Sequence, residues 1–136
     1  MRMVVLHPEK TKFRIRIYDI DSVTMGPTHD LCDSIIVKTG SKFITVNLEK
    51  YKIRIPQKDF SVAIEWLKIP HNESKHKIKH ADGKVTETIT YRPSIGWTDN
   101  QHSTMEAWML DYKGTWRPMF NMHNKTGVSI SAKVKY

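Results

Sequence analysis

The stretch KFRIRIY, residues 12–18, decides the fold class of this chain. Its apolar side chains fall at every second position, and the two arginines and the tyrosine fall between them. Successive side chains of a strand point to opposite faces, so this alternation is typical of a strand with one buried face. The stretch ends in the polar loop Asp21–Asp30, which contains Met25-Gly26-Pro27.

The same alternation continues downstream. Apolar residues at 35–37 lead to Thr39-Gly40-Ser41, and alternation resumes at 44–48. We expect two strands there, joined by a tight turn. A further strand is expected over 51–55, ending at Pro56, which cannot donate a ladder hydrogen bond.

The most apolar stretch is 60–69. Val62, Ile64 and Trp66 fall on one face of an extended chain, and Ala63 and Leu67 fall on the other. We expect a central strand covered on both faces, with Trp66 buried.

The most polar stretch is 70–84, and Asp82-Gly83 is a hairpin-turn signal. It predicts a protruding loop or hairpin tip. Later strands are expected over 88–97, 106–111, 116–120 and 128–136. In the last, we expect Val128, Ala132 and Tyr136 to face inward.

About eight short strands, with no helix long enough for a crossover, predict an all-β fold. We expect an antiparallel β-sandwich, jelly-roll-like, forming a single domain over residues 1–136. The expected core is Phe13, Ile15, Ile17, Ile44, Val46, Leu48, Val62, Ile64, Trp66, Val128, Ile130 and Val134.

The composition favours a folded, basic protein. Hydrophobic residues make up 39% of the chain and charged residues 26%, the net charge is +8, and Cys32 is the only cysteine. A net positive charge favours nucleic acid, anionic lipid or acidic glycan as a partner. The apolar run 3–6 is too short for a signal-peptide core or a membrane span, so we expect no signal peptide and no membrane span in this chain.

Several segments together carry a family resemblance. They are 13–18, 30–31 before 35–37, 45–53, 60–66 and 114–116 before the final strand. In order and spacing, over about residues 11–136, they resemble a β-sandwich domain of Bacteroidetes cell-envelope proteins that commonly follows a carboxypeptidase-regulatory-like domain. The resemblance implies a location in the cell envelope or periplasm, and it supplies no catalytic motif. The family has at least one strand before the segment matching Phe13, so we expect a truncated copy whose open sheet edge self-associates.

The polar stretch holds the candidate cationic site. Lys75, Lys77 and Lys79 recur at alternate positions and could contact phosphate or an anionic glycan. His76 and His80 would share a face of an extended chain and are weak candidates for a metal. The flanking lysines would repel a cation, so we expect no metal and no cofactor.

Trp97 is the candidate aromatic contact. It precedes the polar run Thr98-Asp99-Asn100-Gln101, where an expected strand meets a loop. An aromatic face there could stack on a sugar ring.

No nucleophile elbow, phosphate loop or zincin pair is present in the sequence, and Cys32 precedes an apolar strand. We therefore expect a non-enzymatic accessory or binding module of a cell-envelope protein that binds a glycan or a neighbouring domain. The alternatives are a basic nucleic-acid-binding module, which the absence of aromatics between His71 and Lys84 disfavours, and a structural spacer.

Overall fold

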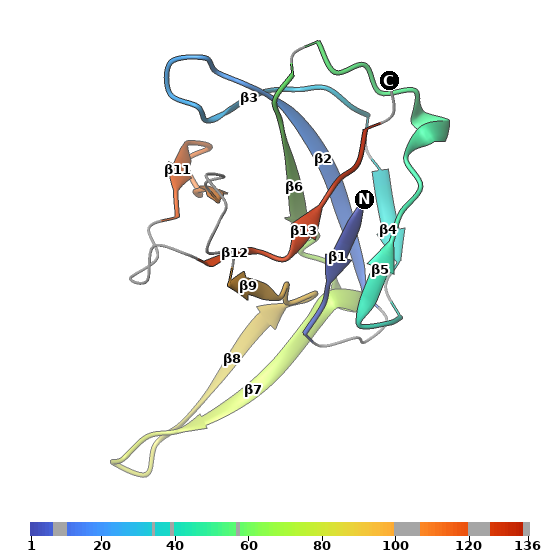
Figure 1. Ribbon diagram of the computed structural model, residues 1–136. Coiled ribbons are helices and arrows are strands. Elements are labelled where there is room, and N and C mark those ends of the chain that lie inside the picture. The colour runs from blue at the N-terminus through green and yellow to red at the C-terminus, as the bar shows by residue number, and fades with distance from the viewer. Residues whose placement is uncertain are drawn as a thin grey trace.

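Two antiparallel sheets face each other across one apolar core (Figure 1). The computed structural model describes residues 1–6, 11–33, 35–38, 40–56, 58–99, 107–119 and 126–134. The strands are β1 (Arg2–Val4), β2 (Lys12–Ile20), β3 (Pro27–Asp30), β4 (Ile35–Lys38), β5 (Phe43–Thr45), β6 (Phe60–Trp66), β7 (Glu73–Lys79), β8 (Val85–Tyr91), β9 (Trp97–Asp99), β10 (Trp108–Leu110), β11 (Trp116–Pro118), β12 (Thr126–Val128) and β13 (Ile130–Ser131). Two 3-10 turns, η1 (Glu49–Tyr51) and η2 (Pro70–Asn72), complete the elements.

The back sheet is built around β2. β2 pairs with β3 and β4 along one edge and with β6 along the other, all antiparallel. The front sheet has the order β13-β1-β5. The predicted all-β antiparallel sandwich is confirmed. The chain has more strands than the eight expected, because several expected strands are divided into short ones.

The core lies between the two sheets. Phe13, Ile15 and Ile17 of β2 are buried, as the alternation predicted, and they pack with Met3 and Ile44 of the front sheet. Burying these side chains removes apolar surface from water, which is the main favourable term in folding. Other expected core residues are half-buried against this cluster: Val46, Leu48, Val62, Ile64 and Ile130. Val128 and Val134 are half-buried as well, but they do not pack against it.

The chain crosses between the sheets after β4. β4 pairs with β2 at the back, whereas β5 pairs with β1 at the front. The two strands that were expected to meet through a tight turn therefore lie in different sheets.

The expected strand over 51–55 is wrong. The chain makes η1 there, and Lys52 adopts a left-handed conformation with φ 47° and ψ 42°. An extended strand cannot pass through that conformation, which costs a residue with a side chain about 1 kcal/mol or more. Residues 52–58 form no strand among those described.

The expected central position of 60–69 is also wrong. In the part of the chain that the structure describes, β6 pairs with β2 alone, so it lies at a sheet edge. Its residues are half-buried, and Trp66 is 48% exposed, not buried as expected. The strand forms as its apolar sequence predicts, but its position in the sheet depends on which other strands pair with it.

The backbone groups of β6 alternate in direction. Leu31 N–H donates to the Ile17 carbonyl, so Ile17 bonds away from β6. Its neighbour Arg16 therefore bonds towards β6, where it faces Ala63. It follows that Ala63 bonds to β2, whereas the N–H and C=O groups of Val62 and Ile64 point to the outer edge.

The hairpin of β7 and β8 extends away from the sandwich (Figure 1). Gly83, at φ 82°, closes its tip between His80 and Lys84, whose backbones are hydrogen-bonded. The expectation of a protruding hairpin tip holds. At the base, the buried Asn72 side chain bonds both the N–H and the C=O of Lys12, and so anchors η2 to β2.

The last expected strand, 128–136, is divided. β12 pairs with β9, β13 pairs with β1, and the chain changes partner at Ser129. Ala132, expected to face inward, is exposed. Tyr136 lies outside the described residues.

Candidate functional site

The three candidate lysines lie on one face of the hairpin. Lys75, Lys77 and Lys79 are exposed, and their cross-strand partners on β8 are Ile89, Glu87 and Val85. Glu73 occupies the same face at the base by alternation. Two carboxylates therefore accompany three ammonium groups, and the net charge of this face is small.

The opposite face of the hairpin carries the two histidines among hydroxyls. His76 Nε2 lies 3.1 Å from both Ser74 Oγ and Thr90 Oγ1, and His80 Nε2 lies 2.7 Å from Thr86 Oγ1. Hydroxyl groups are not the usual partners of a bound transition metal. Among the residues that the structure describes, no three His, Cys, Asp or Glu side chains form a group that could hold a metal ion.

Trp97 lies on β9, beyond the base of the hairpin, and is 51% exposed. β7 runs from this base away from the sandwich, so the structure does not bring Trp97 and the distal lysines to one site (Figure 1). Trp66 is also half-exposed, and its indole N–H donates to the Pro93 carbonyl. Exposure alone therefore does not make Trp97 a better candidate for ligand contact than Trp66.

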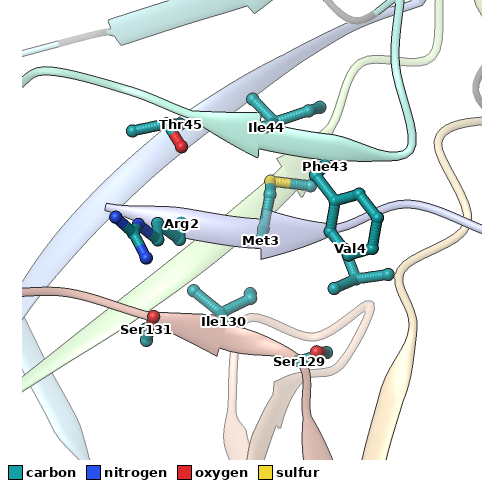
Figure 2. Close-up of a pocket in the computed structure, with 9 residues that line it drawn as sticks. All are labelled: Arg2, Met3, Val4, Phe43, Ile44, Thr45, Ser129, Ile130 and Ser131. Atoms are coloured by element: carbon teal, nitrogen blue, oxygen red, sulfur yellow. The ribbon is translucent and has the colours of Figure 1, made fainter.

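A different surface combines an aromatic ring, cations and hydroxyls. It is the outer face of the front sheet, where an open hollow of about 570 Å³ lies over β13, β1 and β5 (Figure 2). That volume is within the range of small-ligand sites. Nine residues line it: Arg2, Met3, Val4, Phe43, Ile44, Thr45, Ser129, Ile130 and Ser131.

Strand alternation explains which side chains reach the hollow. Met3 and Ile44 turn into the core, where they are 2% and 8% exposed. Their neighbours must then point outward. We call this outer surface, with Arg2, Val4, Phe43, Thr45, Ser129 and Ser131, the front face.

Phe43 and Arg2 lie at opposite ends of the front face. The Phe43 ring, 71% exposed, lies beside Val4, its cross-strand partner, and Arg2 lies two residues before Val4 (Figure 2). Diagonal neighbours of this kind are about 7–8 Å apart. Lys42 Nζ lies 5.8 Å from the centre of the Phe43 ring.

The polar groups of the front face have spare bonding capacity. No hydrogen bond or ion pair joins the side chains of Arg2, Thr45, Ser129 or Ser131 to another described residue. Hydroxyls donate and accept hydrogen bonds, whereas a guanidinium only donates. The face therefore offers an apolar ring, three hydroxyls and a cation to a ligand.

Only part of this site could be predicted from the sequence. Alternation over 44–48 turns Ile44 inward, which by the same rule turns Phe43 outward, so this signal was available. The contribution of β1 had no such signal, because three residues are too few to show a period. Ser129 and Ser131 join the face only because the chain changes partner between β12 and β13.

Comparison with protein-family models, with curated proteins and with solved structures gives no match for this chain. Within the described residues, no helix is long and apolar enough to cross a membrane.

Proposed function

We propose that this chain is a non-enzymatic binding module that holds a glycan on its front face, as an accessory domain of a cell-envelope protein. The observation that carries the proposal is the exposed Phe43 ring on the same sheet face as three hydroxyls that bond no other described residue. An aromatic ring packs on the apolar face of a pyranose, and hydroxyls and Arg2 bond its rim. The location in the cell envelope rests on the family resemblance alone.

The test is binding to an array of neutral and acidic polysaccharides, followed by affinity measurement on the best ligand. Phe43→Ala should weaken binding at least tenfold, because it removes the ring on which the sugar packs. Tyr112→Ala is the matched control, since Tyr112 is 93% exposed and lies between β10 and β11, which form a separate two-stranded sheet. Trp97→Ala tests the contact that the sequence predicted.

If no polysaccharide binds, or if Phe43→Ala binds as the unaltered chain does, the front face is not a glycan site. Loss of binding in Trp97→Ala alone would move the site to β9. A pull-down from an envelope extract would then test docking to a neighbouring protein domain.

The hairpin supports a second candidate, nucleic-acid binding. A two-stranded β-ribbon fits the major groove of B-DNA, and β7–β8 is such a ribbon with both faces exposed. The small net charge of its lysine face weakens this candidate. DNA affinity that falls steeply with salt, and that is lost when Lys75, Lys77 and Lys79 are replaced by glutamate, would support it over the front-face proposal.

A further inference from the structure

We infer that the glycan held on the front face is acidic and carries uronic-acid carboxylates. This inference rests on the proposed function and adds the chemical class of the ligand. It is carried by the charges on and beside the face.

Arg2 supplies a positive charge at one end of the front face. Its guanidinium forms no ion pair with another described residue, and it lies at the end of β1 opposite Phe43. A guanidinium presents two parallel N–H groups that match the two oxygens of a carboxylate. With a sugar ring on Phe43, a carboxylate on that sugar or on the next one along the chain could reach Arg2.

Lys42 supplies a positive charge at the other end of the face. Lys42 Nζ lies over the Phe43 ring, 5.8 Å from its centre, so a second positive charge lies at this end of the face. None of the nine residues lining the hollow is acidic. The attraction for a carboxylate is therefore not opposed by a carboxylate of the site.

The segment that supplies β5 is strongly basic. Over residues 40–58 the only carboxylate is that of Glu49, whereas the cations are Lys42, Lys50, Lys52, Arg54 and Lys58. The lysine face of the hairpin, by contrast, pairs three lysines with two glutamates. The net positive charge is thus greater in the segment that supplies β5 than on the lysine face of the hairpin.

The number of cations on the front face predicts how strongly binding depends on salt, and this salt dependence distinguishes an acidic glycan from nucleic acid. Each phosphate contact contributes roughly −0.9 to the slope of log K against log salt for B-DNA. A face with one guanidinium and one ammonium predicts a slope of about −1 to −2 by the same reasoning. We therefore expect binding that is sensitive to salt but survives at moderate concentrations.

The experiment compares polygalacturonate with the same polymer after methyl esterification, which removes the charge and keeps the sugar. The unaltered chain should bind the acid form at least tenfold more tightly than the ester. Arg2→Gln should abolish this preference, and Arg2→Lys should restore only part of it, because an ammonium lacks the two-pronged geometry. Lys84→Gln, which removes one positive charge at the hairpin tip, should bind as the unaltered chain does.

The failures are distinguishable. Equal binding of the acid and ester forms, with Phe43 still required, would overturn the carboxylate inference and leave the proposed function standing. Equal losses in Arg2→Gln and Lys84→Gln would show attraction by net charge only, and tighter binding of dextran sulfate would assign the face to sulfate; both overturn the inference. If no polysaccharide binds at all, both proposals fail.

Discussion

Glu65 joins two arginines on the outer face of the back sheet. Its carboxylate accepts hydrogen bonds from Arg14 at 2.8 Å and from Arg16 at 2.9 Å, and Arg16 also pairs with Asp30. Burial raises the pKa of Glu65, but the hydrogen bonds from Arg16 and Arg14 outweigh burial and lower the pKa below its usual value. The unfolded chain therefore binds a proton at Glu65 more readily than the folded chain does.

This pKa shift predicts a pH dependence of stability. A carboxylate with a lowered folded pKa stabilises the fold above the unfolded value, near 4.5, and this contribution is lost as the pH falls through the folded value. Between pH 6 and pH 3 the free energy of unfolding should fall less in the Glu65→Gln variant than in the unaltered chain. Denaturant titrations across that range measure the difference, and parallel curves would contradict it.

Two isoleucines that face each other across β2 and β6 should differ in their contribution to stability. Ile15 is fully buried, whereas its partner Ile64 is half-buried at the sheet edge. Ile15→Ala should cost ~2–5 kcal/mol, and Ile64→Ala roughly 1–2 kcal/mol, because less apolar surface is removed from the core. Equal losses in urea denaturation would show that the edge of β6 is covered.

At the scale of elements, the outer edge of β6 is open among the described residues. The N–H and C=O groups of Val62 and Ile64 point outward from it, and the only charge on the strand, Glu65, is held by arginines. Open apolar edges of this length pair with other strands unless charges or proline block them. The self-association expected from the sequence is therefore expected at this edge, since residues 2–4 form β1 between two partners.

Val62→Pro tests the edge. It removes an outward N–H and leaves the bonds to β2, so it should reduce the concentration-dependent association seen by sedimentation. Ala63→Pro is the matched control, because it removes an inward N–H and should destabilise the monomer instead. A monodisperse monomer at high concentration in the unaltered chain would contradict the prediction.

The elements also show what the sequence could and could not predict. The alternation in β2 and the Asp82-Gly83 turn are local signals, and both elements formed where expected. Whether β6 lies at the centre or the edge depends on distant strands, so its apolar sequence alone could not decide it. The lysines of the hairpin could be found for the same local reason, whereas the front face needed three segments from distant parts of the chain.

At the scale of the whole molecule, the hairpin and the front sheet contribute unequally to stability. Both hairpin faces are exposed, whereas Met3 and Val5 of the N-terminal segment are 2% and 0% exposed. Replacing residues 75–89 by Asn-Gly, between the cross-strand partners Ser74 and Thr90, should lower Tm by less than about 4 °C.

Deleting residues 1–5 is the comparison, and it should abolish cooperative unfolding because it removes the middle strand of the front sheet. Thermal melts followed by circular dichroism measure both changes. A large loss of Tm on shortening the hairpin would show that the sandwich depends on it.

The neighbouring strands of the front sheet are far apart in the sequence, so they are synthesised at different times. β1 is synthesised long before one of its two neighbours, because β13 contains residues 130 and 131. At a synthesis rate of ~5–20 residues per second, a time on the order of 10 s passes between the synthesis of β1 and that of β13. During this interval Met3 and Val5 have only β5 and the back sheet to cover them. The nascent chain is thus expected to need protection by chaperones at β1 until residues 130 and 131 have been synthesised.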